Sequence, residues 1–319
     1  MTSASPLGRA LCAMITPFDA SGALDPDGAG RLAVRLVDEG CDGLVLSGTT
    51  GESPTTSDAE KAELIRAVRE AVGDRASVVA GVGSADTAHA RELARQAEQA
   101  GADGLLLLTP YYSKPPQDAI EEHFRTVADT TGLPVLLYDI PHRTGTRIEP
   151  ETMLRLAEHP RIVGVKDCAY DLLGTQKVLA RTELAYYTGC EEFILPLYAV
   201  GGAGYISTVA NVVPAELRAI LDAFDAGDTA GATLLQRLAL PLMELMMADG
   251  LPGTVTAKAL LGAMGLPAGP VRAPLRAADE GRTARLVTAY EALVQQGRPA
   301  LVSNSSPSGG TSRPKAGGA

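Results

Sequence analysis

The sequence is poor in the residue types that hold metals and disulfides. Of its 319 residues, four are cysteine and four are histidine. The cysteines lie far apart with no C-x-x-C pair, and the histidines show no metal-ligand spacing. This pattern disfavours a zinc site and a disulfide framework, so we expect reduced thiols in a cytoplasmic protein. The residues in question are Cys12, Cys41, Cys168, Cys190, His89, His123, His142 and His159.

Positive charge is also scarce. The chain has 28 Lys and Arg against 38 Asp and Glu, a formal net charge of -10 at pH 7. Nucleic acids and anionic membranes bind basic surfaces, so we expect neither as a partner. No apolar run approaches the ~18 residues needed to span a bilayer. Residues 1–8 lack the basic and then apolar pattern of a secretory signal.

Short apolar runs dominate what is present. With 45% hydrophobic residues, the chain can build one large domain or two ordinary ones. Eight such runs recur about every 30 residues, and amphipathic stretches with helical spacing lie between them. The runs occupy residues 11–15, 43–46, 77–80, 104–108, 134–138, 162–166, 184–187 and 204–207. The clearest helical stretches are 25–39, 57–72, 86–100, 117–130 and 214–224.

Eight strand–helix units predict a (β/α)8 TIM barrel of parallel strands over residues 9–225. An open doubly wound sheet is the alternative, but no G-x-G-x-x-G follows the first run. Three further helical stretches, at 230–248, 255–264 and 278–295, predict a C-terminal helical extension over residues 226–297, either a cap or an interface. Residues 298–319 are rich in Ser, Gly and Pro and are expected to be a disordered tail.

Lys166 stands out because it closes an apolar run. An unpaired buried ammonium is costly, and a desolvated lysine loses its proton more readily, which makes it a nucleophile able to form a Schiff base. The alternative is a strand-end lysine whose tip reaches water. In a barrel, active sites lie at the carboxyl ends of the strands, where Lys166 falls. Side chains alternate along a strand, so Lys166 shares a face with Gly164 and Ile162, and Gly164 leaves room for it.

Tyr138 ends the run before that of Lys166. Adjacent strands lie ~4.8 Å apart, so the phenol and the amine can meet over the barrel mouth, where the phenol can shuttle protons. Taken alone, Tyr138 is better interpreted as a strand-end aromatic whose hydroxyl reaches water. Residues 48–52, Gly-Thr-Thr-Gly-Glu, lack the lysine of a P-loop but permit a tight turn whose N–H groups can hold a carboxylate. Arg143 offers a planar fork for a second carboxylate, unless it is an ordinary solvated arginine.

These motifs resemble the dihydrodipicolinate synthase / N-acetylneuraminate lyase family. The resemblance rests on residues 138–145 with Lys166, on the turn at 48–52 and on Thr-Pro-Tyr-Tyr at 109–112, and it covers about residues 11–293. The synthase branch of actinobacterial type is the best match. The resemblance implies a class I aldolase-type enzyme that condenses pyruvate with L-aspartate 4-semialdehyde to 4-hydroxy-tetrahydrodipicolinate, in lysine and diaminopimelate biosynthesis.

The resemblance also implies roles for single residues. Lys166 forms the imine with pyruvate, so no metal or organic cofactor is expected. The proton relay is Tyr138, Thr49 and Tyr112, the last reaching into a neighbouring subunit. The backbone N–H groups of Thr49 and Thr50 hold the pyruvate carboxylate. Arg143 binds the aldehyde carboxylate, and Gly189 and Ile206 line the pocket. The implied assembly is a homotetramer, a dimer of dimers, with only small molecules as substrates.

Some positions depart from the pattern of the synthase branch. His142 replaces a small residue, and Cys190-Glu191-Glu192 replaces an Asp-Asp pair. These changes leave two alternatives open: a related pyruvate aldolase or lyase for another aldehyde or sugar acid, and a non-catalytic barrel that binds a keto acid.

A second departure concerns regulation. At the positions that bind the feedback inhibitor lysine in regulated members, this chain has Asp58, Lys61, Ala85 and His89. Lys61 repels an ammonium ligand and His89 replaces a carboxylate, so lysine inhibition is expected to be weak or absent.

Overall fold

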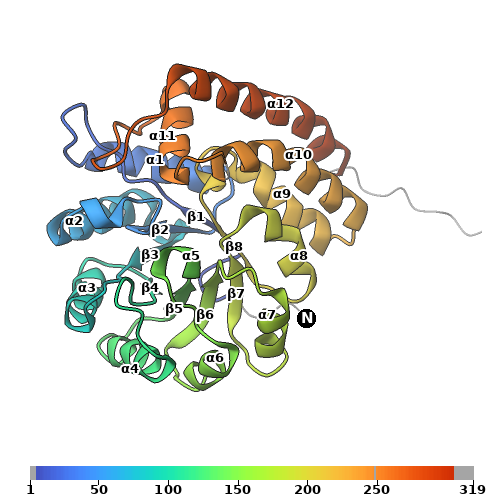
Figure 1. The fold of residues 1–319 in the computed structure, drawn as a ribbon. Helices are drawn as coiled ribbons and strands as arrows, with labels where there is room; N and C mark the ends of the chain where they lie inside the picture. Colours follow the sequence, from blue (N-terminus) through green and yellow to red (C-terminus); the bar gives the residue numbers. More distant parts are fainter. Residues whose placement is uncertain (1–4, 248, 305–319) are drawn as a thin grey trace, which may run out of the picture.

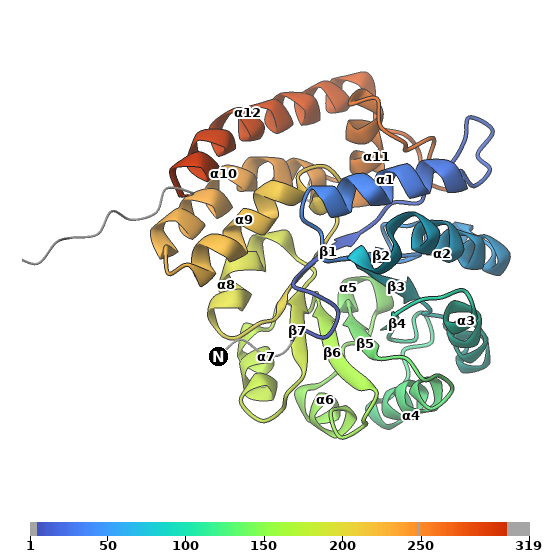
Figure 2. The same ribbon diagram turned by 180° about the vertical axis from the view of Figure 1, so that it is seen from behind.

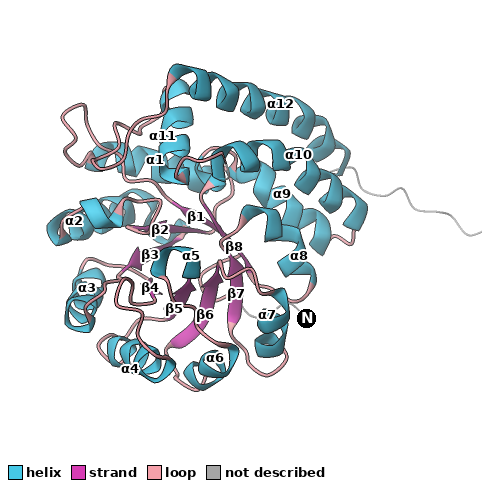
Figure 3. Ribbon diagram, viewed as in Figure 1, coloured by secondary structure: helices cyan, strands magenta, loops and turns pink. Residues whose placement is uncertain are grey.

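The structure, a computed structural model, describes residues 5–247 and 249–304. Eight parallel strands form one closed ring in the order β1 to β8, with β8 pairing back to β1 (Figures 1 and 3). This confirms the TIM barrel and rules out the open sheet. The strands are β1 Ala10–Ala13, β2 Gly43–Leu46, β3 Ser77–Gly81, β4 Gly104–Leu108, β5 Val135–Asp139, β6 Ile162–Asp167, β7 Ala185–Thr188 and β8 Gly204–Ser207.

Helices surround the ring on all sides (Figures 1 and 2). Those of the barrel are α1 Pro26–Asp38, α2 Asp58–Val72, α3 Thr87–Gln99, α4 Gln117–Ala128, α5 Pro141–Thr144, α6 Pro150–Leu156, α7 Leu172–Leu179, α8 Ile194–Ala199 and α9 Pro214–Asp225. Short 3-10 turns are η1 Ser53–Thr55, η2 Gly73–Arg75, η3 Glu191–Phe193 and η4 Val209–Asn211. Polar caps fix several helix starts: Asp25 accepts from the N–H of Gly28, and Ser57 and Glu60 form a reciprocal capping box.

Alternation along the strands divides the barrel core in two. One set of side chains fills the interior of the ring, for example Val45, Val79 and Leu106. The other set, which includes Leu44 and Val78, packs outward against the helices. Because both faces of every strand are covered, the strands read as short continuous apolar runs rather than as an alternating pattern.

Strand β6 departs from the strict alternation expected of it. The β5–β6 register shifts by one residue between Val135 and Leu136. As a result Val163 packs against the interior cluster and Ile162 joins the outer core, the reverse of the expectation. Such a shift inserts one extra residue into a strand and swaps the faces of the residues before it. Lys166 lies after the shift and is unaffected.

The C-terminal extension consists of α10 Thr229–Met247, α11 Gly253–Ala263 and α12 Glu280–Asn304. It packs along α9 and forms a second layer on one side of the barrel (Figures 1 and 2). Helix α12 runs on to Asn304. The start of the expected tail at residue 298 stays a prediction. The rest of that expected tail, 305–319, lies outside the described residues. Within the part of the chain that the structure covers, no helix is long and apolar enough to cross a membrane.

Candidate active site

The two residues expected to react lie side by side at the carboxyl ends of neighbouring strands. Tyr138 of β5 and Lys166 of β6 are Cα partners in the sheet. Both side chains are buried, with exposed fractions of 4% and 5%. The Nζ of Lys166 lies 4.6 Å from the centre of the Tyr138 ring. The structure therefore favours the buried amine over a strand-end lysine whose tip reaches water.

Gly189, rather than Gly164, makes room for the lysine side chain. A Cβ at Gly189 would lie 2.6 Å from Cε of Lys166 and 2.4 Å from Sγ of Cys168. A Cβ at Gly164 would instead meet the carbonyl oxygen of Ala185 at 2.4 Å. The expectation about Gly164 is thus wrong because it used one strand alone, whereas the close neighbour follows the adjacent strand β7.

Neighbouring groups act in opposite directions on the pKa of the Tyr138 hydroxyl. Burial raises its pKa well above the ordinary value, and the nearby thiol of Cys168 adds to this. A hydrogen bond with Thr49 and the positive charge of Arg143 act in the opposite direction. At neutral pH the phenol therefore keeps its proton and can act as a hydrogen-bond donor.

The turn between β2 and α2 places Thr49 and Thr50 over the barrel mouth. It is closed by bonds from the N–H of Ser53 to the carbonyl of Gly48 (3.2 Å) and from the N–H of Glu52 to that of Thr49 (3.2 Å). The Oγ1 of Thr50 shares a 2.7 Å hydrogen bond with Oγ1 of Thr208 beyond β8. These contacts fix the turn from within and from the end of β8, which lies on the other side of β1 from β2.

Two adjoining cavities, here called lobes, lie above the strand ends and share part of their lining. The first lobe, of about 430 Å³, is lined by Lys166 and Gly189. The second, of about 480 Å³, extends toward α2 and α3. Thr49, Tyr138 and Arg143 line both lobes, so the residues expected to react lie at their junction. Both volumes are in the range of small-molecule sites.

The remaining predicted residues divide into two groups. Arg143 and His142 lie on α5, which sits over the centre of the ring, and His142 lines the lysine lobe (Figures 1 and 2). Thr50 also lines that lobe. Tyr112 and Ile206 are among the linings of neither lobe. Ile206 is fully buried in the barrel interior, whereas Tyr112 is 93% exposed with a φ of 72°. Within one chain the structure therefore brings together Lys166, Tyr138, Thr49, Thr50, Arg143 and Gly189.

Comparisons with known proteins agree with this geometry. The model of the Dihydrodipicolinate synthetase family matches residues 6–293. The chain is 76% identical to 4-hydroxy-tetrahydrodipicolinate synthase 1 of Streptomyces coelicolor over 90% of this chain and 94% of that protein. It is 58% identical to 4-hydroxy-tetrahydrodipicolinate synthase of Acidothermus cellulolyticus, over 88% and 91%.

The chain belongs to the dihydrodipicolinate synthetase family. Among solved structures, DHDPS from Cyanidioschyzon merolae with lysine bound superposes with a TM-score of 0.88 at 35% identity, covering 91% of this chain and 99% of that one. The dihydrodipicolinate synthase of Acinetobacter baumannii complexed with pyruvate gives 0.85 at 31%, covering 91% and 99%.

A chain of polar side chains around Cys168 is a feature of this family member that the sequence did not predict. The thiol of Cys168 contacts the hydroxyl of Tyr138 and the thiol of Cys190. Cys190 in turn contacts Tyr170, whose hydroxyl donates to Glu192 at 2.9 Å. Cys168 directly follows β6 and Cys190 lies two residues after β7, but their contact depends on the β6–β7 register, which the sequence does not show.

Glu191 lines the lysine lobe, and its carboxylate is bonded to the end of β8 and the residues that follow it. Its carboxylate accepts from the hydroxyl of Ser207 (3.0 Å) and from the N–H groups of Thr208 (2.8 Å) and Val209 (3.2 Å). Burial raises its pKa. Its bonds fix Thr208, the partner of Thr50, so Glu191 supports the threonine turn through Thr208.

Three of the four positions tied to lysine feedback line the second lobe; Ala85 is not among its lining residues. Asp58, Lys61 and His89 line it, and Nε2 of His89 pairs with Asp58 at 2.9 Å. The ammonium of Lys61 donates to the carbonyls of Ser53 (3.0 Å) and Thr56 (2.5 Å). The cation of Lys61 is therefore held at this lobe, and weak lysine inhibition stays a prediction.

Proposed function

We propose that this protein is a 4-hydroxy-tetrahydrodipicolinate synthase, which condenses pyruvate with L-aspartate 4-semialdehyde in lysine and diaminopimelate biosynthesis. The observation that carries the proposal is the buried Lys166, with its amine over the ring of Tyr138 and its stem against Gly189. The 76% identity to the Streptomyces coelicolor synthase supports the reaction, and the pyruvate complex of the related structure supports the first substrate.

In the proposed mechanism the amine of Lys166 attacks the keto carbon of pyruvate. The carbinolamine loses water to give a protonated imine, and Tyr138 donates the proton that the departing hydroxide needs, with Thr49 as the next group in the relay. The N–H groups at Thr49 and Thr50 face the substrate carboxylate. The chemistry uses the covalent imine as its electron sink, so neither a metal nor an organic cofactor is part of the proposal.

The imine then acidifies the methyl group of pyruvate. Loss of that proton gives an enamine, whose carbon attacks the aldehyde carbon of the second substrate and forms the new C–C bond. The amine of the semialdehyde closes the ring by attacking the imine carbon, which frees Lys166 and gives the cyclic hydroxylated product. Arg143, on the rim at the junction of the lobes, is the group suited to the carboxylate of the incoming aldehyde.

The proposal extends to the assembly and location of the protein. Tyr112 is almost fully exposed, at 93%, with a positive φ, so it is positioned to leave its own subunit. Tyr170, just before α7, and Leu173, within it, are also exposed, by 60% and 66%. Exposed large apolar side chains at two separate places support a homotetramer built as a dimer of dimers. A cytoplasmic location fits an enzyme of amino-acid biosynthesis with four free cysteines.

The test is a steady-state assay of the purified protein with pyruvate and a panel of aldehydes. We expect L-aspartate 4-semialdehyde to give the highest kcat/KM. The bulky His142 and the thiol of Cys190 at the lysine lobe are the observations that favour a different aldehyde. A higher kcat/KM with another aldehyde would contradict the substrate, and binding of pyruvate without turnover of any aldehyde would leave a keto-acid-binding barrel.

A further inference from the structure

The C-terminal extension reaches the threonine turn through a buried ion pair. Glu52 ends the turn with a φ of 56° and is 2% exposed. Its Oε1 lies 2.6 Å from Nζ of Lys258, a residue of α11. The other carboxylate oxygen accepts the N–H of Arg272, from the loop after α11, at 2.8 Å. Both partners of the turn's last residue therefore belong to the extension.

Lys258, like Glu52, is buried and bonded on more than one side. Its side chain is 3% exposed, and its ammonium donates to the carbonyl of Pro270 at 2.8 Å. It also lies 4.0 Å from the centre of the Phe18 ring. Burial lowers the pKa of Lys258, and the carboxylate of Glu52 opposes that change. Removing both charges from water costs free energy that the attraction between them often only just offsets. Stabilisation of the fold therefore does not by itself explain why this buried ion pair is present.

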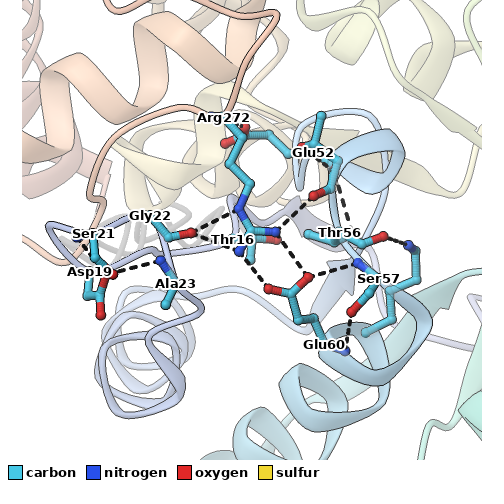
Figure 4. Close-up of polar contacts among 12 residues, drawn as sticks. Thr16, Asp19, Ser21, Gly22, Ala23, Glu52, Thr56, Ser57, Glu60 and Arg272 are labelled. Carbon is cyan, nitrogen blue, oxygen red and sulfur yellow. Dashed lines mark hydrogen bonds and ion pairs between the residues drawn. The ribbon is translucent and has the colours of Figure 1, made fainter.

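Arg272, in the loop after α11, bonds this loop to residues next to the threonine turn. Its guanidinium pairs with Glu60 at 2.5 Å and donates to the carbonyls of Gly22 (2.8 Å) and Thr55 (2.8 Å). Figure 4 shows this fork between α2 and the loop at Gly22, with Glu52 beside the backbone of Arg272. The loop after α11 is thus bonded both to the loop before α1 and to the start of α2, in the first and second strand–helix units of the barrel.

A direct contact joins the same helix to a residue expected to bind substrate. The hydroxyl of Thr254, in the first turn of α11, donates to the carbonyl of Thr49 at 3.3 Å. Thr254 and Pro252 line both lobes of the cavity. The extension is therefore a wall of the site as well as a neighbour of the barrel.

We infer that Glu52 and Lys258 are positioning residues, which set the affinity for pyruvate by fixing the orientation of the Thr49–Thr50 turn. The inference rests on the proposed function of that turn. Hydrogen-bond donors that bind a carboxylate must be held in place before the substrate arrives, and misplacement by about 1 Å can cost on the order of a hundredfold. The ion pair supplies that rigidity from outside the barrel.

The experiment uses E52Q, K258M and the double variant E52Q/K258M of the full chain. Each is incubated with increasing pyruvate and borohydride, and the trapped adduct on Lys166 is measured without any aldehyde present. Thermal unfolding is recorded for each variant. Val127→Ala, a fully buried position of α4 away from the extension, is the matched control for lost stability.

Each single variant leaves one buried charge unpaired, so both should unfold at lower temperature, and the double variant should recover part of the loss. The half-saturating pyruvate concentration of the double variant should still rise roughly ten- to a hundredfold, while Val127→Ala keeps the wild-type value. Thr254→Val, which removes only the hydroxyl contact with Thr49, should raise it as well and serves if the double variant does not fold.

The outcomes separate this inference from the function on which it rests. A double variant, or Thr254→Val, that traps pyruvate with the wild-type half-saturation would show that the pair is merely structural and would overturn the inference alone. Absence of any adduct in the unmodified protein would overturn the proposed function and the inference together.

Discussion

Lys166 owes its proposed reactivity to the side chains packed around it. Its stem fits against Gly189, its ammonium faces the ring of Tyr138, and the Tyr138 hydroxyl contacts Thr49 and Cys168. The sequence was enough to single out Lys166 and Tyr138, because each closes an apolar run. It was not enough to show what surrounds them, since Gly189 and Cys168 meet only through the register between β6 and β7.

The hydroxyl of Tyr138 should be required for proton transfer. We expect Tyr138→Phe to lower kcat by roughly a hundredfold or more, because positioned proton donors contribute about that factor. Tyr187→Phe is the matched control: Tyr187 is the partner of Lys166 on β7, but its hydroxyl donates to the carbonyl of Gly8 at 3.0 Å. Steady-state assays compare the two, and equal loss of kcat in both variants would contradict the role of Tyr138.

The space left by the missing side chain of Gly189 should be required for the reactive position of Lys166, and not only for folding. Gly189→Ala places a methyl group 2.6 Å from Cε of Lys166, so the side chain must move and adduct formation with pyruvate should slow at least tenfold. Gly262→Ala on α11 is the control, because a Cβ there meets nothing within 4 Å. Adduct formation at the wild-type rate in Gly189→Ala would show that Lys166 does not depend on this gap.

At the level of whole elements, the ends of β5 and β6 place two carboxylates on the outer face of the sheet. Asp139 and Asp167 follow the two reactive residues and are paired in register. Burial raises the pKa of Asp139 to about 7, the charge of Asp167 adds to the rise, and the N–H of Ile148 opposes it. The apolar runs predicted these strands to within a residue or so, but not the register shift in β6, which leaves no composition signal.

The unfolding free energy of the protein should therefore depend on pH in a defined direction. The folded protein binds the Asp139 proton more tightly than the unfolded chain, so this group's contribution declines as pH rises from about 4, the unfolded value, to about 7. Asp139→Asn cannot titrate. Relative to wild type, the variant should gain roughly 2 kcal/mol of unfolding free energy between pH 5 and pH 8. Urea unfolding at both pH values measures this, with the exposed Asp27→Asn as control; an unchanged difference would contradict the assignment.

For the whole molecule, the periodicity of the sequence predicted the barrel and the three helices of the extension. It did not predict that the extension lines the site, because the contacts of Glu52 with Lys258 and Arg272 join residues about 200 positions apart. Tyr112 was expected to act in a neighbouring subunit. In a single chain it is 93% exposed and lines neither lobe, so one chain does not test this role.

Mixing two inactive variants tests the shared site. Tyr112→Phe and Lys166→Ala should each lose most activity as pure proteins. After dissociation and reassembly together, subunits that keep Lys166 receive Tyr112 from their neighbours, so activity should return to a sizeable fraction of wild type. Size-exclusion chromatography with light scattering should give a tetramer. A monomer with full activity, or no recovery on mixing, would contradict the proposed assembly.

The central claim is that Lys166 forms the covalent imine with pyruvate. The most direct measurement is borohydride reduction in the presence of pyruvate, followed by digestion and mass spectrometry of the peptides. The account predicts a reduced pyruvate adduct on the peptide that contains Lys166, absent from Lys166→Ala and from samples without pyruvate. An adduct on another lysine, or none under conditions where the protein is folded, would contradict it.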